Sequence, residues 1–179
     1  GSNKTDVPRD QVAYDEADNN PQAYKTYGGS VKARYDFGAI DFTSITAYSK
    51  LESFLDEELD WTATDILGAV QTVDNRANSQ EFRLTSNGDT ALRWLGGVYY
   101  LGVDRDLDTQ VTLSPTSAPI PLPATSSTDD NASYAVFGQV SYRFSEAWEG
   151  TVGMRYDIDK REQLDNAAAM TYDAKFTSV

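Results

Sequence analysis

The clearest pattern of apolar and polar positions lies between residues 133 and 159, where side chains alternate with a period of two. Apolar residues and glycine occupy the even positions, and mostly polar residues occupy the odd ones. A period of two is typical of a β-strand, because successive side chains point to opposite faces. Residues 145–147 separate the stretch into halves. The pattern therefore predicts two paired strands joined by a tight turn.

Aromatic rings lie near both ends of the apolar face of this hairpin, which is typical of strands that cross a membrane. A soluble hairpin with one buried face also alternates. Soluble strands average only about 5 to 6 residues, however, and these two strands are about twice as long. We therefore expect the apolar face to touch lipid. The predicted lipid-facing residues are Tyr134, Val136, Val140, Tyr142, Phe144, Trp148, Val152, Met154 and Tyr156.

Other stretches show strand patterns that are less regular, with strong turn signals at residues 38–39 and 87–89. One stretch changes parity near Thr43, which indicates either a bulge there or a strand with apolar groups on both faces. Another is apolar at both parities over residues 95–103, so its faces stay undetermined. The predicted strands outside the hairpin are residues 27–37, 40–55, 79–86 and 92–108.

Two long segments are polar and lack a period. Residues 1–23 are predicted to be a cloning scar, formed by the opening glycine and serine, followed by a flexible lead-in. The remaining residues, 24–179, are expected to form one segment of β-strands, interpreted as part of a β-barrel. Residues 109–131 contain four of the six prolines, and we expect a long exposed loop there.

Two weaker signals complete the pattern. Residues 56–76 open with an acidic cluster and are expected to be loop, with a short strand possible at residues 69–73. A further strand is predicted to begin near Met170. The whole pattern predicts an all-β chain that folds as an antiparallel up-and-down meander.

Composition excludes several classes of chemistry. The chain of 179 residues has no histidine and no cysteine, which removes Ser-His-Asp and Cys-His nucleophile systems and the ordinary zinc, haem and iron–sulfur ligand sets. We expect neither enzymatic activity nor a cofactor. The net charge of -13 also makes nucleic acid an unfavourable partner, because phosphate binding depends on Lys and Arg.

The longest apolar run, residues 94–103, is too short for a membrane-spanning helix, which needs about 20 residues. A transmembrane strand needs only about 9 to 11 residues and shows the bilayer one side chain in two. A hydrophilic average is therefore compatible with an outer-membrane β-barrel. The many tyrosines and glycines and the lack of cysteine are typical of such barrels.

The hairpin sequence YAVFGQVSYRFSEAWEGTVGMRYDIDKRE, residues 134–162, resembles a barrel hairpin of TonB-dependent outer-membrane receptors. Residues 27–50, 79–86 and 92–101 are similar to successive strands of the same barrels, in the same order. The resemblance implies a barrel of about 22 strands around a plug, located in the bacterial outer membrane. It also implies energised uptake of a scarce nutrient of the siderophore-iron, cobalamin or oligosaccharide type.

The sequence departs from this family pattern because no plug domain and no energy-coupling box precede the first strand. We therefore expect a fragment of a large transmembrane β-barrel, or else a small closed barrel of about eight strands. The partners implied for a fragment are outer-membrane lipid, the remainder of the barrel, the plug domain and, through that plug, a TonB-type energy transducer.

A second functional class stays open at the level of sequence. A soluble secreted β-sandwich or small barrel that binds carbohydrate or protein would also use tyrosine, tryptophan and acidic loops. A requirement for detergent would favour the membrane barrel, whereas monodisperse behaviour in buffer would favour the soluble module.

Charged side chains on the polar parity of the strands are candidates for the barrel lumen. A ladder of arginine and carboxylate pairs across neighbouring strands most often supports the wall or its contact with the plug, and direct contact with an anionic ligand is the alternative. The lumen and ligand-binding candidates are Arg34, Arg83, Arg143 and Arg155, and the carboxylates on the same parity are Glu81, Glu149 and Asp157.

Asp104, Asp106 and Asp108 place three carboxylates on one face of a strand. The expected role is a solvated strand end, with a divalent-cation rim as the alternative. An EF-hand is excluded, because Thr109 replaces the required glycine and Pro115 replaces the bidentate glutamate. If the rim exists, calcium should bind it with millimolar affinity, and calorimetry that detects no heat on calcium addition would rule it out.

Overall fold

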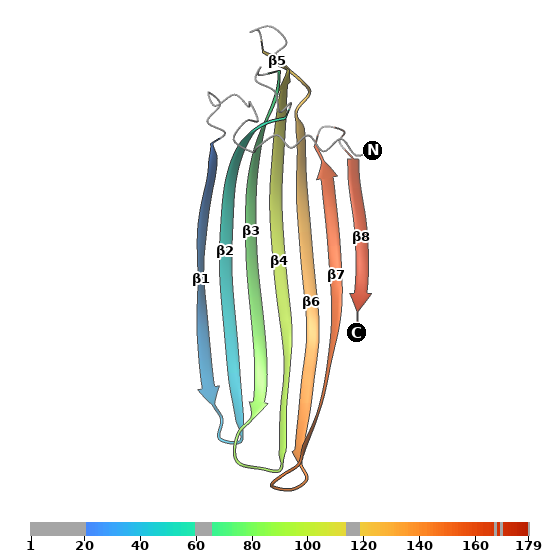
Figure 1. Cartoon of the computed structure of the whole chain (residues 1–179). Helices are drawn as coiled ribbons and strands as arrows, with labels where there is room; N and C mark the ends of the chain where they lie inside the picture. Colours follow the sequence, from blue (N-terminus) through green and yellow to red (C-terminus); the bar gives the residue numbers. More distant parts are fainter. Residues whose placement is uncertain (1–20, 60–65, 114–118, 167, 169, 179) are drawn as a thin grey trace, which may run out of the picture.

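The computed structural model describes residues 21–59, 66–113, 119–166, 168 and 170–178, and its strands form one antiparallel sheet (Figure 1). Neighbours in the sheet follow the order β1-β2-β3-β4-β6-β7-β8, and the short β5 pairs with β4. The strands are β1 (Gln22–Asp36), β2 (Ile40–Glu58), β3 (Leu67–Ser86), β4 (Leu92–Leu113), β5 (Ile120–Pro121), β6 (Thr125–Arg143), β7 (Glu149–Asp165) and β8 (Met170–Ser178).

This architecture confirms the predicted all-β antiparallel meander and decides between its two forms. The strands β1 and β8 lie at opposite sides of the sheet in Figure 1, and no pairing between them occurs within the described ranges. The sheet is therefore open. The alternative of a small closed barrel of about eight strands is wrong for this chain, because closure requires the first and last strands to share a hydrogen-bond ladder.

Short turns lie at one end of the sheet and carry the predicted glycines. Gly38 and Gly88 have φ angles of 89° and 104°, a left-handed conformation that glycine adopts without steric cost. A third turn follows β6, where the Phe144 amide donates to the Trp148 carbonyl at 2.9 Å. We call this the turn end (lower end of Figure 1) and the opposite end the loop end.

The strand register is continuous through the position where a bulge was one of two predicted possibilities. Residues of β2 pair one to one with β1 from Asp41 to Leu55 and with β3 from Ile40 to Glu58. A bulge near Thr43 would place two residues opposite one. The other possibility is correct, because Phe42 and Ile45 belong to opposite faces of an unbroken strand.

Several strands run further toward the loop end than the sequence pattern predicts. β3 begins at Leu67, so the loop expected through residue 76 is wrong, and residues 69–73 are the first part of β3. β4 reaches Leu113 and β6 begins at Thr125, so strands occupy both ends of the loop predicted over residues 109–131. Alternation of apolar residues reveals a strand only where one face is buried or touches lipid. These polar extensions lack that pattern, and they are strands because backbone hydrogen bonds join them to a neighbour on each side.

The sheet has no second layer within the described ranges. Ala135, with 4 % of its surface exposed, is their one buried apolar residue. No helix in the described part of the chain is long and apolar enough to span a membrane. Because a protein core normally buries apolar side chains between layers, the apolar face of this sheet must be covered by something outside the described residues.

Candidate functional site

The register of the ladders assigns every strand residue to one of two faces, because directly paired residues project to the same side of a sheet. Val140 of β6 lies opposite Trp94 of β4 and opposite Val152 of β7. We call the side that carries these residues the apolar face. The opposite side, which carries Arg83 and Arg155, is the arginine face. Residues that lie opposite one another across successive strands form a row.

The apolar face carries all of the predicted lipid-facing strand residues, and they are exposed. The exposed fraction is 49 % for Val140, 78 % for Val152 and 71 % for Met154, so these side chains do not pack inside a protein core. Phe144 and Trp148 lie beside the turn and are 70 % and 74 % exposed. The face continues across the other strands through Trp94, Val98, Phe82, Leu84, Phe42, Tyr35 and Val31.

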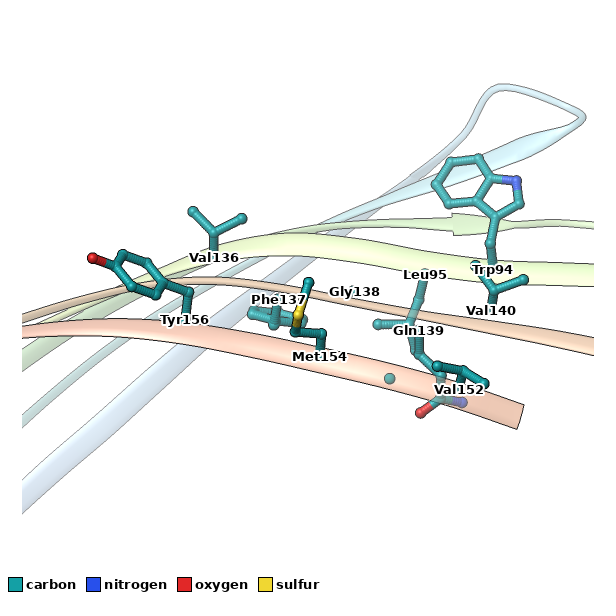
Figure 2. Close-up of a pocket in the computed structure, with 11 residues that line it drawn as sticks. Trp94, Leu95, Val136, Phe137, Gly138, Gln139, Val140, Val152, Met154 and Tyr156 are labelled. Atoms are coloured by element: carbon teal, nitrogen blue, oxygen red, sulfur yellow. The ribbon is translucent and has the colours of Figure 1, made fainter. Parts of the chain in front are cut away.

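A shallow hollow of about 590 Å³ lies in this apolar face (Figure 2). Its floor contains Gly138, which pairs directly with Gly96 of β4. Figure 2 shows Trp94, Val136 and Tyr156 around the hollow, projecting from one side of the sheet. A Cβ atom on Gly138 or Gly96 would meet its nearest neighbour at 3.5 or 3.8 Å, which is ordinary contact. Packing within the chain therefore does not require glycine at either position.

Toward the loop end, the apolar face changes from apolar to charged. One row combines Lys50, Arg76 and Asp104, and the same row continues through Asp130 and Glu162. Lys50 Nζ lies 2.7 Å from Glu52 and 2.9 Å from Asp74. A strand that carries an apolar band in its middle and charges at one end matches the surface expected where a barrel wall leaves the bilayer.

All of the arginines predicted for the lumen share the arginine face, and each contacts a carboxylate. The N–O distances are 2.6 Å for Arg34–Asp41, 2.5 Å for Arg83–Glu81, 2.7 Å for Arg143–Asp89 and 2.7 Å for Arg155–Asp157.

The expected ladder between neighbouring strands is only partly correct. Arg34 reaches from β1 to Asp41 on β2, whereas Arg83 and Arg155 pair with carboxylates two positions away on their own strands. Residues i and i+2 also lie on one face of a strand. The sequence therefore predicts the face on which each arginine lies, but not the carboxylate with which it pairs. Each pair neutralises an arginine locally, which makes this face a balanced charged wall.

The turn-end pair joins Arg143 to Asp89, which lies in the turn between β3 and β4. Arg143 Nη2 donates to Asp89 Oδ1 at 2.7 Å. This hydrogen bond and the positive charge of Arg143 lower the pKa of Asp89 below its ordinary value. Asp89 therefore stays ionised at neutral pH and ties the turn to the end of β6.

A layer of rings and guanidinium groups crosses the middle of the arginine face. The Phe137 ring covers Gly97, where a Cβ atom would lie 2.5 Å from Phe137 Cζ. The Arg83 guanidinium carbon lies 5.9 Å from the centre of the Phe137 ring, and that of Arg155 lies 5.6 Å from the centre of the Tyr99 ring. These are cation–π distances, so the two arginines are held by ring faces as well as by carboxylates.

Some polar atoms on this face lack hydrogen bonds. Glu81 Oε1 and Arg83 Nε are buried and have no hydrogen-bond partner in the part of the chain that the structure describes, and the same holds for Asp41 Oδ1. Glu81 Oε1 is nevertheless in ion contact with Arg83 Nη2 at 2.5 Å. Buried polar atoms normally have partners, and of these three only Arg83 Nε and Asp41 Oδ1 have neither a hydrogen bond nor an ion contact within the described ranges.

Two arginines of β4 belong to the same wall, although sequence reasoning did not find them. Arg93 pairs with Glu149 of β7, and Arg105 lies 3.4 Å from Asp129 of β6. The stretch of β4 between them is apolar at both odd and even positions. The sequence therefore did not show which residues of β4 lie on which face of the sheet. The single usable signal was the shared odd parity of Arg93 and Arg105.

The aspartates of the predicted cation rim lie on the apolar-face side of β4, beyond the apolar band. Asp104 lies opposite Asp130, and Thr128 Oγ1 donates to Asp106 Oδ1 at 3.1 Å. Within the described ranges, no group of three or more carboxylate residues is arranged to hold a metal ion. A calcium rim that includes Asp108 stays a prediction, with calorimetry as its test.

These features together define a section of a transmembrane β-barrel wall: one long-stranded meander with an exposed apolar face and a charged opposite face. The chain belongs to the TonB-dependent receptor-like β-barrel family, whose model, described as TonB dependent receptor-like, beta-barrel, matches residues 2–178. Members of this family are proteins of the bacterial outer membrane, which is the location of this chain.

Solved structures of outer-membrane receptors share the fold. The ferric yersiniabactin uptake receptor FyuA from Yersinia pestis has a TM-score of 0.68 and 14% identity, with 90% of this chain and 25% of the receptor covered. The ferric citrate transporter FecA, in its unliganded form, has a TM-score of 0.64 and 10% identity, with 88% and 24% covered. The siderophore receptor PiuA from Acinetobacter baumannii has a TM-score of 0.60 and 18% identity, with 90% and 29% covered.

The chain thus spans about a quarter of the length of these receptors. At such low identities the likeness shows the fold alone. The search among curated proteins finds no match.

Proposed function

We propose that this chain is a section of the wall of an outer-membrane receptor that takes up a scarce nutrient. The main support for the proposal is that one open sheet has an apolar face and an opposite face of paired charges. An exposed apolar face suits lipid, and a face of paired charges suits a polar lumen. The unpaired edges of β1 and β8 then join the remaining strands of the barrel, which removes both open edges.

The orientation of the wall follows from its connections. Outer-membrane barrels have short turns on the periplasmic side and longer loops outside the cell. The turn end, with Gly38 and Gly88, therefore faces the periplasm, and the loop end faces the exterior. In this orientation Tyr134 lies near the outer margin of the apolar band, and Trp148 lies near the inner margin, where aromatic side chains favour the membrane interface.

The arginine face is proposed to line the lumen and to contact a plug domain. Every predicted lumen arginine is already paired with a carboxylate, which favours support of the wall over direct binding of an anionic ligand. A TonB-type energy transducer would act through that plug, and this chain would form the fixed side of the contact.

Among the nutrient classes, a ferric chelate is the one we propose first. The three similar structures are described as a ferric yersiniabactin uptake receptor, a ferric citrate transporter and a siderophore receptor. Cobalamin and oligosaccharides are the alternatives within the same type of receptor. A soluble sandwich is not supported, because the described residues form one sheet whose apolar face is exposed.

Uptake by cells tests this function directly. Deletion of the gene that encodes the natural full-length polypeptide should abolish accumulation of one labelled ferric chelate under iron limitation, and the intact gene should restore it. Dissipation of the proton-motive force should stop accumulation while surface binding persists, because transport is energised and binding is not. Labelled cobalamin and oligosaccharides serve as parallel substrates.

Each outcome of the uptake experiment has a definite meaning. Loss of cobalamin or oligosaccharide uptake alone would replace the ferric chelate within the same proposed function. Unchanged uptake of all three classes in the deletion strain would contradict a role in nutrient import.

A further inference from the structure

The turn between β3 and β4 contains an asparagine that is followed by glycine. Asn87 and Gly88 belong to the strong turn signal of the sequence, and Gly88 has a φ angle of 104°. The backbone nitrogen that follows an asparagine can attack the side-chain carbonyl carbon, and the attack is least obstructed when the following residue is glycine. A Cβ atom on Gly88 would meet no heavy atom within 4 Å beyond its chain neighbours, so this nitrogen is accessible.

The side chain of Asn87 is folded against the nitrogen that would attack it. The Gly88 amide donates to Asn87 Oδ1 at 2.9 Å. The carbonyl carbon Cγ is bonded to that oxygen, so it lies beside the same nitrogen. No backbone hydrogen bond from the Gly88 amide occurs in the part of the chain that the structure describes. The nucleophile is therefore close to its target and is not engaged in a strand ladder.

Asn78 of β3 provides an internal comparison, because it is also followed by a small residue. Ser79 pairs with Ala47 of β2 on one side and with Leu101 of β4 on the other. Backbone amides inside a sheet are used by the hydrogen bonds between strands. Attack on Asn78 would first have to open this ladder, whereas attack on Asn87 breaks no contact between strands.

We propose that Asn87 is a site of spontaneous deamidation that yields aspartate or isoaspartate. The Gly88 nitrogen loses its proton to water and forms a bond to Cγ of Asn87. The bond between Cγ and Nδ2 then breaks, and ammonia leaves. Water opens the resulting five-membered imide at either carbonyl. Cleavage at Cγ gives aspartate, and cleavage at the main-chain carbonyl carbon gives isoaspartate. The reaction consumes only water, and the inference goes beyond the proposed function.

Isoaspartate at this position would strain a turn that is held on both sides. The Asn87 amide donates to the Ala39 carbonyl of the neighbouring turn at 2.8 Å. On the other side, Arg143 donates to Asp89 at 2.7 Å. Isoaspartate lengthens the main chain between these two contacts by one methylene group, whereas aspartate only adds a charge. We therefore expect the isoaspartate form, and not the aspartate form, to loosen the turn end.

The test uses the natural full-length protein in detergent, incubated at mildly alkaline pH and digested briefly with trypsin under acidic conditions. Cleavage after arginine places Asn87 in the peptide of residues 84–93 and Asn78 in that of residues 77–83. Mass spectrometry counts the exchange of an amide for a carboxyl group in each peptide. Asn87 should convert at least roughly tenfold faster than Asn78, because opening the ladder costs about one backbone hydrogen bond. An isoaspartate methyltransferase should label the peptide of residues 84–93.

The unfolded protein is the matched control for this measurement. In denaturant Asn78 should convert faster than in the folded protein, because its ladder is gone, whereas the rate at Asn87 should change little. Equal conversion of Asn78 and Asn87 in the folded protein would overturn the proposal. Conversion of Asn87 in the unfolded protein alone would overturn it as well, because the turn would then protect the residue. Both measurements use the unaltered sequence, so neither depends on the folding of a variant.

Hydrogen exchange separates the added methylene group from the added charge. The variant Asn87→Asp carries the charge of both products on a main chain of normal length. Its peptide of residues 84–93 should exchange like the wild type, whereas the isoaspartate form should exchange several-fold faster. Equal exchange in the isoaspartate form and in Asn87→Asp would contradict the expected loosening of the turn end.

Discussion

Replacement of Val152 by arginine is expected to reduce the free energy of unfolding in lipid vesicles by about 2 to 4 kcal/mol, the range for a cationic residue at the bilayer midplane of a β-barrel. Val152 of β7 lies between Trp148, just before the strand, and Tyr156, and 78 % of its surface is exposed on the apolar face. With the apolar face in lipid, as proposed, an arginine there places its guanidinium group in hydrocarbon or distorts the bilayer around it. Denaturant titration of the full-length protein, followed by tryptophan fluorescence, measures the loss.

The neighbouring position provides the control for this substitution. Thr151 projects to the arginine face, where its hydroxyl lies 2.9 Å from the Ser141 hydroxyl. Thr151→Arg loses that hydrogen bond, which is worth about 1 kcal/mol, but places its charge on the arginine face, which already carries paired charges. Equal losses for Val152→Arg and Thr151→Arg would contradict the assignment of the two faces, and a loss confined to Thr151→Arg would reverse it.

The β6–β7 hairpin could be predicted from sequence because its two faces differ in polarity over residues 133–159. Val140, Val152 and Met154 lie on the apolar face, whereas Ser141 and Thr151 lie on the arginine face, which carries polar groups. Successive residues of a strand point to opposite faces, so apolar and polar residues alternate along both strands. Strand identity, faces and the turn at residues 145–147 all follow from that single constraint.

The faces of β4 could not be predicted from alternation. Leu95 and Leu101 belong to the arginine face, so apolar residues occur at both parities and no alternation remains. On this strand the arginine face packs rings and aliphatic groups around Gly97, and this packing depends on partners from other strands. Arg93 and Arg105 could not be assigned to the wall for the same reason.

The first part of β3 was expected to be loop, with a strand only possible at residues 69–73, for a different physical reason. It lies beyond the apolar band, where neither lipid nor a core selects for apolar side chains. Asp74 is held there by Lys50 from β2 and by Arg76 on its own strand, at 2.9 Å in both cases. Such pairs depend on the register between strands, which a single sequence does not specify. The partner of Arg34 is undetermined from sequence for the same reason.

Replacement of Gly97 by alanine is expected to cost about 1 to 3 kcal/mol, the usual range for overpacking a tight site. The new Cβ atom would lie 2.5 Å from Phe137 Cζ and 2.7 Å from the Phe82 carbonyl oxygen. The ring can rotate away, but it then loses its position 5.9 Å from the Arg83 guanidinium carbon. The carbonyl belongs to the β3 backbone, which is fixed by pairing with β4.

Gly96→Ala is a close control, because Gly96 precedes Gly97 on the same strand and faces the other side. Its Cβ atom would meet its nearest neighbour at 3.8 Å, so unfolding should change by less than about 0.5 kcal/mol, as for substitutions without a packing clash. A cycle with Phe137→Ala then separates the two contacts of Gly97. If the ring is the main obstacle, Gly97→Ala should cost little in the Phe137→Ala background. If the Phe82 carbonyl is the main obstacle, the cost should persist there. Equal effects of Gly97→Ala and Gly96→Ala in the wild-type background would contradict the close packing of the arginine face, and with it the argument that this face is a built wall.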